Sequence, residues 1–325
     1  MTAPPDVPGG GSLVEGYRAA IGDGPMVALE SLARSLRGHR IAMVNSTAAG
    51  GGVAEILHRL VPLLNELGVP TTWEVLPADP HFYEISKTIH NALHGAPGAL
   101  SPADREHFLE TSRRAAERLR LDADLVFVHD PQPVVLAGLR REPGQRWLWR
   151  CHIDLSRADP DALDFLLPHV ERHDAAVFSH PSFVPRLTRP AFLAPPSIDP
   201  LSDKNREMSE EEADALLEPF GLPRETPLVT QVSRFDRLKD PVGVIEAFVL
   251  ARRRERAHLV LAGGGADDDP EGAAVLAETR ERAGARRDVT ILSLPPDSHR
   301  AINALQRRST VVVQKSLREG FALTV

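Results

Sequence analysis

Short runs of apolar residues alternate with longer amphipathic segments along most of the chain. In the first part, the short runs predict buried strands at 40–45, 71–76, 124–128, 146–153 and 175–179. Between them lie segments with helical spacing of their apolar residues, at 13–37, 53–67, 82–93 and 102–119. Strands that alternate with helices in this way predict a parallel sheet that helices cover on both faces.

The same rhythm begins again after 195–200 (PPSIDP), whose prolines are typical of a stiff connector. Strands are predicted at 227–232, 258–262, 288–292 and 310–314. Helices are predicted at 209–219, 241–251, 271–284 and 297–307. The pattern therefore predicts an α/β protein with two Rossmann-like, doubly wound domains. A flexible tail at 1–12 precedes a first domain at 13–200 and a second domain at 201–325.

Length and composition narrow the class of protein. A chain of 325 residues suits two domains, and 26% charged with 42% hydrophobic residues is ordinary for a soluble globular protein. A net charge of −7 without a long basic run argues against a nucleic-acid partner. No apolar run predicts a membrane span, and residues 1–12 lack the basic start and apolar core that are typical of a signal peptide. The single cysteine, Cys151, fits a reducing cytoplasm.

Two cations follow the first strand of the second domain. Arg234 and Lys239 are five positions apart, between the strand at 227–232 and the helix at 241–251. Backbone N–H groups at a helix start, together with two cations, suit a diphosphate. A solvated, charged turn fits the same spacing equally well.

Glycine runs follow two predicted strands. After 40–45 come Asn45, Ser46 and Thr47 and then a run at 50–52, where a backbone without side chains can approach an anion. The run is neither a dinucleotide fingerprint nor a phosphate-binding Walker loop, and a plain tight turn is the alternative. A second run at 263–265 is followed by three aspartates at 267–269, which are more typical of a solvated loop than of a metal site.

Polar residues also gather where strands of the first domain end. They are His129, Asp130, His152 and Asp154. In open α/β sheets ligands bind beyond the carboxyl ends of strands, so these side chains are candidates for sugar or nucleotide contacts. A helix cap is the alternative for Asp130, and a structural hydrogen bond is the alternative for His152.

Two further groups are candidates for sugar contacts. Helical spacing places Lys87, His90 and Asn91 on one face, although a solvated face has the same spacing. After the last strand come Lys315, Arg318, Glu319 and Gly320. A carboxylate there, beside backbone N–H groups of a following helix, could hold sugar hydroxyls. No metal-binding cluster and no nucleophile motif stands out, so no metal is predicted.

Seven segments together resemble a known family. They are NSTAAGGGVAEILHRLVPLLNELG, SKTIHNALHG, VFVHDPQP, WRCHIDLS, SRFDRLKDP, AGGGADDDPEG and QKSLREGF. From about residue 13 to its end the chain is similar to retaining glycosyltransferases of family 4, which have the GT-B architecture. SRFDRLKDP and REGF mark the broad superfamily. The first three segments resemble its trehalose-forming branch, the glycosyl-transferring trehalose synthases.

The resemblance implies a reaction and roles for residues. A nucleoside-diphosphate glucose and glucose would give α,α-trehalose with retention at the donor carbon. The catalytic residues would be Arg234, Lys239, His152 and Glu319. Arg234 and Lys239 would hold the diphosphate, with Gly51, Gly52 and Gly264 beside the donor. Glu319 matches the first Glu of a Glu-x7-Glu motif that binds donor hydroxyls, and the acceptor side would be formed by Lys87, His90, Asn91 and Asp130.

The resemblance also sets expectations for ligands. The donor would be ADP-, UDP- or GDP-glucose, no metal or other cofactor would be required, and the chain could form a homodimer. The second Glu of the motif would lie two residues beyond Val325, so we expect a truncated second domain, exposed apolar surface and uncertain activity. The alternatives are a retaining trehalose phosphorylase of the same superfamily and a non-catalytic sugar- or nucleotide-binding remnant.

Overall fold

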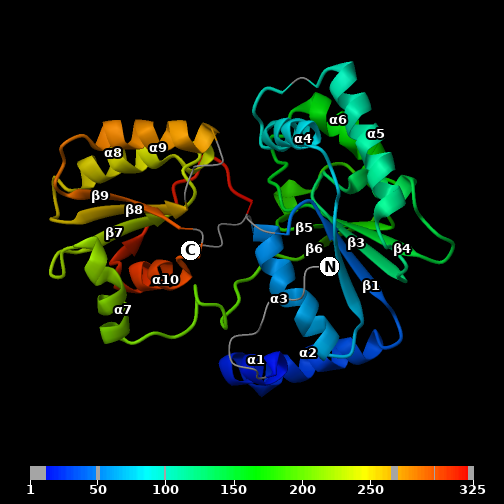
Figure 1. The fold of residues 1–325 in the computed structure, drawn as a ribbon, viewed down its shortest axis with the longest axis horizontal. Coiled ribbons are helices and arrows are strands. Elements are labelled where there is room, and N and C mark those ends of the chain that lie inside the picture. Colours follow the sequence, from blue (N-terminus) through cyan, green and yellow to red (C-terminus); the bar gives the residue numbers. More distant parts are fainter. Residues whose placement is uncertain (1–11, 49–51, 99, 265–269, 296, 321–325) are drawn as a thin grey trace. The chain divides into compact units, whose positions relative to one another are not determined.

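The chain folds into two compact units, Met1–Asp199 and Pro200–Val325 (Figure 1). The structure is a computed structural model that describes residues 12–48, 52–98, 100–264, 270–295 and 297–320. Each unit is built around one parallel sheet with helices on both faces. The α/β pattern predicted from the sequence is therefore confirmed for both parts of the chain.

Six parallel strands form the sheet of the first unit, in the order β2-β1-β3-β4-β5-β6. Their bounds are β1 (Ile41–Asn45), β2 (Thr71–Val75), β3 (Leu125–His129), β4 (Arg146–Arg150), β5 (Ala175–Phe178) and β6 (Ala191–Leu193). Residue Ile41 of β1 lies opposite Thr71 of β2 and Leu125 of β3. Because all strands run in the same direction, their carboxyl ends meet at one edge.

Helices cover both faces of this sheet. They are α1 (Leu13–Ile21), α2 (Asp23–Ser35), α3 (Gly52–Glu66), α4 (Pro80–Leu93), α5 (Pro102–Arg118) and α6 (Pro160–Val170), with short 3-10 helices η1 (Val134–Gly138) and η2 (Pro181–Phe183). On one face, Trp147 and Trp149 pack with Phe82 of α4 and Phe108 of α5 in a buried core. On the other face, Leu57 of α3 lies in a second core with residues of α2 and β1.

Local sequence explains where several helices begin. Ser101 and Asp104 form a reciprocal capping box at the start of α5, and Pro102 occupies its first turn. Gly22 has a φ of 85°, which separates α1 from α2 within the segment predicted as helical at 13–37. These two signals are local, so they can be read from the sequence alone.

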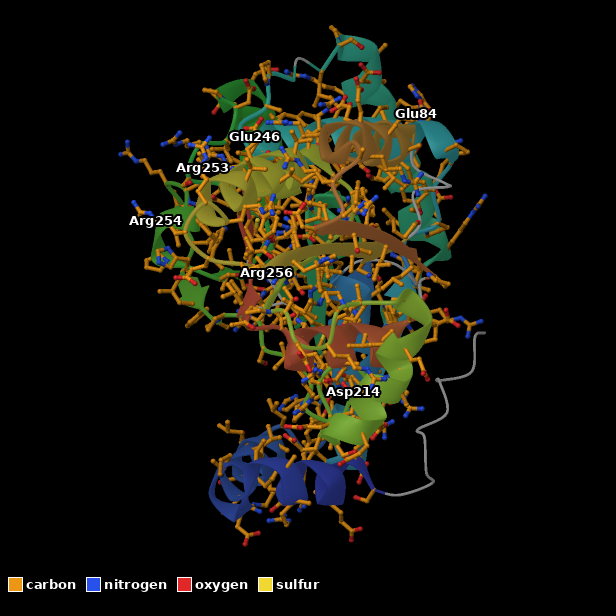
Figure 2. The ribbon with its side chains drawn as sticks, turned by 90° about the vertical axis from the view of Figure 1, so that its left-hand side faces the viewer. Glu84, Asp214, Glu246, Arg253, Arg254 and Arg256 are labelled. Atoms are coloured by element: carbon orange, nitrogen blue, oxygen red, sulfur yellow. The ribbon has the colours of Figure 1, made fainter. Side chains whose placement is uncertain are left out.

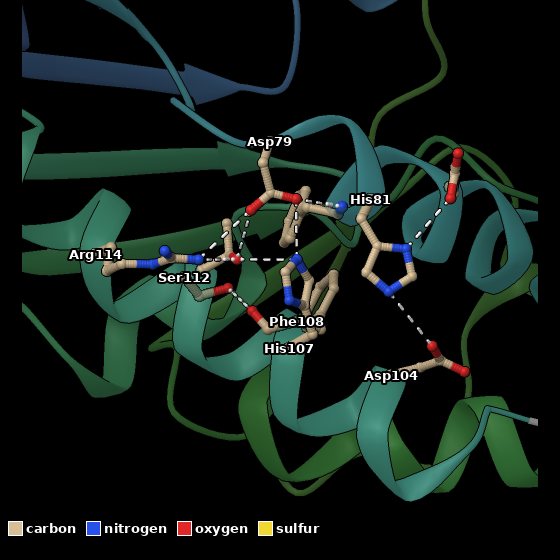
Figure 3. Close-up of polar contacts among 10 residues, drawn as sticks. Asp79, His81, Asp104, His107, Phe108, Ser112 and Arg114 are labelled. Carbon is tan, nitrogen blue, oxygen red and sulfur yellow. Dashed lines mark hydrogen bonds and ion pairs between the residues drawn. The ribbon is translucent and has the colours of Figure 1, made fainter.

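Asp79 ties the start of α4 to α5 (Figure 3). Its carboxylate accepts hydrogen bonds from the N–H of Phe82 at 2.9 Å, from Nε2 of His107 at 2.9 Å and from the hydroxyl of Thr111 at 3.3 Å. Arg114 lies 3.5 Å from the same carboxylate. These donors favour the charged form and lower the pKa of Asp79 to about 2, with the Phe82 N–H as the largest cause.

We expect Asp79→Ala to lower the free energy of unfolding by about 1–2 kcal/mol, because it removes a helix cap and a partly screened link to α5. Urea unfolding at pH 7 measures this loss. The matched control is Glu106→Ala, an exposed α5 carboxylate whose one ion pair within the described residues is with Arg113 at 3.6 Å. This change should alter stability by less than about 0.5 kcal/mol.

The comparison of wild type with Asp79→Ala also gives a pH test for Asp79. The pKa falls from its usual 3.8 to about 2, so the stabilisation is complete above about pH 4. It is lost as pH falls through the folded-state pKa. The stability difference between wild type and Asp79→Ala should therefore narrow between about pH 4 and pH 2, and a constant difference would contradict the assignment.

The second unit has a four-stranded parallel sheet in the order β10-β7-β8-β9. Its strands are β7 (Leu228–Val232), β8 (His258–Gly264), β9 (Val289–Leu294) and β10 (Val311–Val312). Its helices are α7 (Glu210–Leu217), α8 (Pro241–Ala251), α9 (Pro270–Ala283) and α10 (His299–Arg308), with 3-10 helices η3 (Glu218–Phe220) and η4 (Arg237–Lys239). One core joins α7 and α10 to the sheet, and another joins α8 and α9 to its opposite face (Figure 1).

Four predicted strands differ by two or more residues from the observed ones. β4 ends at Arg150 instead of 153, because the N–H of His152 donates to the side chain of Asp130 and not to a neighbouring strand. β8 continues to Gly264 and β9 to Leu294, since Gly263 and Gly264 still pair with β9. β10 is only Val311–Val312, and neither the short β6 nor the helix α6 was predicted.

Exposed arginines gather at the turn after α8. Figure 2 shows Arg253, Arg254 and Arg256 there, and Arg252 pairs with Asp288 at 2.7 Å. This turn precedes His258, the first residue of β8, so these cations lie at the amino edge of the sheet. They are therefore separate from the carboxyl edge where the candidate ligand-binding residues lie. Within the described residues, no helix is long and apolar enough to cross a membrane.

Candidate active site

The candidate residues of the first unit follow β1, β3 and β4, which are adjacent in its sheet. The stem of the loop after β1 is held by side chains at three successive carbonyls. Tyr83 donates to the carbonyl of Ser46 at 3.1 Å, Asn45 to that of Thr47 at 2.8 Å, and Nε2 of His58 to that of Ala48 at 2.8 Å.

The asparagine in this stem is itself fixed. Asn45 is only 2% exposed, and its amide oxygen accepts the indole N–H of Trp73 at 2.8 Å. Gly52 is the exposed first residue of α3, at a helix start that favours an anion. Gly51 lies outside the described residues. The loop thus leaves β1 from a stem that side chains of β1, β2, α3 and α4 hold in place.

Asp130 is the polar centre between β3 and β4. Its φ of 65° is in the left-handed region, and its N–H donates to the carbonyl of Arg150 at 2.8 Å. Its carboxylate accepts the N–H of His152 at 2.8 Å, and its own carbonyl accepts the indole N–H of Trp149 at 2.9 Å. Two of these three hydrogen bonds fix the backbone of Asp130, and the third, from His152, holds its carboxylate at the edge of the sheet.

Burial raises the pKa of Asp130 from 3.8 to about 6. The N–H of His152 and the charges of His90 and Arg150 oppose this effect. His90 belongs to the last turn of α4. On the same helix Lys87 is exposed, and Asn91 is half-buried with its carbonyl accepting the N–H of Ala96 at 3.0 Å.

We expect Asp130→Asn to raise stability at pH 8 by about 1–3 kcal/mol. The folded-state pKa is raised, so the wild type is most stable below about pH 4 and loses stability as pH rises towards about 6. The asparagine amide oxygen can keep the bond to His152, and asparagine tolerates the left-handed backbone.

Thermal unfolding of both proteins between pH 4 and pH 8 measures this difference. The difference in stability between wild type and Asp130→Asn should increase between about pH 4 and 6 and stay constant above pH 6. Turnover of Asp130→Asn should fall if the carboxylate binds a sugar. Asp154→Asn is the control for stability: among the described residues, this side chain accepts only the N–H of Ser156, at 2.9 Å. A wild type that is as stable as Asp130→Asn at pH 8 would contradict the raised pKa.

In the second unit, Lys239 and Glu319 are brought together by β7 and β10, which pair side by side. The ammonium of Lys239 forms an ion pair with the carboxylate of Glu319. Gln314 and Ser316 also donate to this carboxylate, at 2.9 and 3.2 Å. Arg234 differs, because its side chain is 71% exposed and lies 3.6 Å from Asp236.

Sequence reasoning missed a second ion pair at the same edge. Asp240, with a φ of 48°, caps α8 by accepting the N–H of Gly243 at 3.0 Å and pairs with Lys315. An aspartate directly before Pro241 is a recognisable helix-start signal, so the cap could have been found. Its pairing with Lys315, 75 positions away, has no signal in the sequence.

Two glycines end β8 and differ in their surroundings. A Cβ on Gly263 would overlap the carbonyl oxygen of Ser233 and lie 3.2 Å from the ring of Phe235. A Cβ on Gly264 would meet no atom of the described residues within 4 Å. Gly263 is therefore required for packing, whereas the described residues leave room for a side chain at Gly264. The aspartates at 267–269 lie outside the described residues.

No metal-binding group stands out in the part of the chain that the structure describes, where no three His, Cys, Asp or Glu residues are placed to hold an ion. Arg318 and Gly320 are half-buried beside Glu319. A helix start after Glu319 was predicted to supply N–H groups, and that segment lies outside the described residues.

Two family models match the chain. Residues 43–185 match the family described as trehalose synthase, N-terminal domain, and residues 213–325 match glycosyl transferases group 1. A trehalose synthase of Pyrococcus horikoshii is 42% identical over 96% of this chain and 76% of its own. A trehalose synthase of Rubrobacter xylanophilus is 41% identical over 91% of this chain and 74% of its own. A trehalose phosphorylase of Pleurotus pulmonarius is 27% identical over 96% and 49%.

Solved structures give the fold. The trehalose-6-phosphate synthase OtsA has a TM-score of 0.67 at 16% identity, covering 87% of this chain and 80% of its own. A structure described as trehalose-6-phosphate from E. coli bound with UDP-2-fluoro glucose has a TM-score of 0.65 at 15% identity, with the same coverage. The fold is thus that of GT-B glycosyltransferases. With about 40% identity to curated trehalose synthases over nearly its whole length, the chain belongs to the trehalose synthase family of glycosyltransferases.

Proposed function

We propose that this chain is a retaining glucosyltransferase that makes α,α-trehalose from a nucleoside-diphosphate glucose and glucose. One observation carries the proposal: a cation and a carboxylate, Lys239 and Glu319, meet at the carboxyl edge of β7 and β10. Ligands of open α/β sheets bind at such an edge. A diphosphate needs a cation there, and sugar hydroxyls need an acceptor.

The chemistry follows from these charges. The bond between the anomeric carbon and the phosphate oxygen breaks, and the hydroxyl oxygen of glucose bonds to that carbon on the same face. The nucleoside diphosphate and the hydroxyl proton are released. Lys239, with Arg234, stabilises the negative charge that develops on the departing diphosphate. In the absence of donor Lys239 and Glu319 neutralise each other, and the donor offers each a new partner.

The first unit supplies the sugar-binding residues in this proposal. His152 contacts the transferred glucose, and Gly51 and Gly52 bring backbone N–H groups to the donor. Asp130 and His90 form the acceptor side, with Lys87 and Asn91 from the same helix. The proposal is supported by the hydrogen bond from the N–H of His152 that holds the Asp130 carboxylate, and by the charge of His90, which favours the charged form of Asp130.

The proposed donor is a nucleotide sugar, with ADP-, UDP- and GDP-glucose as candidates. The related fold that binds UDP-2-fluoro glucose supports this class of donor. Glucose and trehalose are the other proposed small-molecule partners, no further cofactor is proposed, and a homodimer remains an expectation. Gly264, the last residue of β8, would lie beside the donor.

Product analysis tests the proposal. The chain is incubated with glucose and each of the three donors, and trehalose and released diphosphate are measured in equal amounts. A form extended to the full length of the trehalose synthase relatives is assayed beside it. Trehalose from either form supports the glucosyltransferase. Hydrolysis of the donor without trehalose would contradict it.

Trehalose phosphorylase is the second candidate, because such enzymes are 27% identical to the chain. Phosphate would then replace the diphosphate at Lys239 and Arg234. Trehalose with phosphate should yield glucose 1-phosphate, and nucleotides should not bind. If neither set of substrates gives a product, a sugar- or nucleotide-binding protein is the remaining reading.

A further inference from the structure

Two histidines are paired at the edge of the first sheet. His129 is the last residue of β3, and His152 lies two residues beyond the end of β4. Nδ1 of His129 is 3.1 Å from Nε2 of His152, and the rings are 5.4 Å apart and nearly parallel, at 18°. A hydrogen bond between two imidazole nitrogens contains one proton, so one ring donates and the other accepts.

The surroundings of His129 decide which ring donates. His129 is 3% exposed, and its Nε2 has no hydrogen-bond partner among the described residues. If His152 donated, the remaining proton of His129 would sit on this nitrogen as a buried N–H without an acceptor. Such orphaned N–H groups are rarer in proteins than unmatched acceptors. The cation of Arg150 close by also favours a bare nitrogen over an N–H.

We propose that His129 is a positioning residue that donates from Nδ1 and holds His152 in its neutral Nδ1–H tautomer. Nε2 of His152 then accepts the hydrogen bond from His129. The N–H of this half-buried ring is on its other nitrogen, Nδ1. His152 therefore meets its ligand as a hydrogen-bond donor, suited to an oxygen lone pair of a sugar. The identity of that sugar as the transferred glucose rests on the proposed function.

Both rings stay uncharged at neutral pH in this arrangement. Burial, followed by the charge of Arg150, lowers the pKa of His152 to about 3, and the pKa of His129 is also well below its usual value. The other ionisable groups at this edge are Asp130, which binds the N–H of His152, His90 and the buried thiol of Cys151. Two imidazolium ions could not form the observed contact.

Long-range proton–nitrogen NMR of the histidine-labelled chain tests the tautomer without any turnover. The chain contains two internal standards. Nδ1 of His173 faces the carbonyls of His169 and Val170 at 3.2 and 3.1 Å, so its proton is on Nδ1. Nε2 of His58 faces the carbonyl of Ala48, so its proton is on Nε2. We expect His152 to match His173, and a match to His58 would overturn the proposal.

Three variants at position 129 separate positioning from packing. His129→Asn can keep a donor near the original Nδ1, His129→Leu removes it, and His129→Asp reverses it to an acceptor. We expect kcat for trehalose formation to stay within about threefold in His129→Asn and to fall about 10- to 100-fold in His129→Leu. In His129→Asp the NMR pattern of His152 should shift to that of His58.

These experiments distinguish a failure of the positioning role of His129 from a failure of the proposed function. Equal kcat in His129→Asn and His129→Leu, at equal melting temperature, would overturn the positioning role. If His129→Asp does not fold, the other two variants still decide. If the wild type makes no trehalose, the proposed function fails, whereas the tautomer of His152 is still read from its spectrum.

Discussion

Lys239→Met should lower the rate of trehalose formation by about 100- to 1,000-fold, the size of effect found when one preorganised stabiliser of a developing anion is removed. Lys239 is half-buried, its ammonium faces Glu319, and its carbonyl accepts the side-chain N–H of Gln231 at 2.7 Å. Methionine keeps the length and apolar stem of the side chain. The loss should therefore appear in kcat, because the charge matters most as the diphosphate departs.

Arg237→Met is the matched control, from the same short helix η4. Its side chain is 58% exposed, and its guanidinium pairs with Glu278 at 2.8 Å. Turnover of this variant should stay within about twofold of wild type. Calorimetric binding of a nucleoside diphosphate adds a second readout, with affinity reduced in Lys239→Met only. Equal losses in both variants would contradict the role of Lys239.

Gly263→Ala should destabilise the second unit by about 3 kcal/mol or more. The added methyl group would overlap the carbonyl oxygen of Ser233, which is backbone and cannot rotate away. It would also press on Phe235, which is 5% exposed and packs against Val275 and Leu276 of α9. The substitution therefore forces apart two neighbouring strand ends and the buried ring between them.

Gly264→Ala is the control one position later, where a methyl group meets no atom of the described part of the chain within 4 Å. Its urea midpoint should stay close to that of wild type. All three tryptophans, at 73, 147 and 149, belong to the first unit, so their fluorescence reports on that unit. Far-UV circular dichroism reports on both. If the urea midpoint measured by circular dichroism were as high in Gly263→Ala as in Gly264→Ala, the prediction would be contradicted. The backbone at the end of β8 would then shift to accommodate the added methyl group.

Periodicity predicted the architecture because each buried strand and each amphipathic helix carries its own local pattern. The helix α5, with Ser101, Pro102 and Asp104 at its start, is an example. The predicted strand ends were less accurate where a side chain competes with a neighbouring strand for a backbone N–H group. Asp130 takes the N–H of His152, so the apolar run at 146–153 overstates β4 by three residues.

The candidate site was predicted in part because residues beyond parallel strands converge at one edge. Arg234, Lys239 and Glu319 were named from their positions after strands, and the structure pairs the last two. The pairing of His129 with His152 was not predicted. Its 23-residue separation has no periodic signal, and only the alignment of β3 with β4 brings the rings together.

Labelling of Cys151 can measure how often the first unit opens in the chain as it stands. Its thiol is fully buried beyond the end of β4, and burial raises its pKa, so very little reactive thiolate is present at neutral pH. A soluble disulfide reagent must wait until this part of the sheet opens. The labelling rate therefore measures how often the first unit opens, without mutation or dye. Cysteines placed on the second unit's surface would react first and could be labelled selectively.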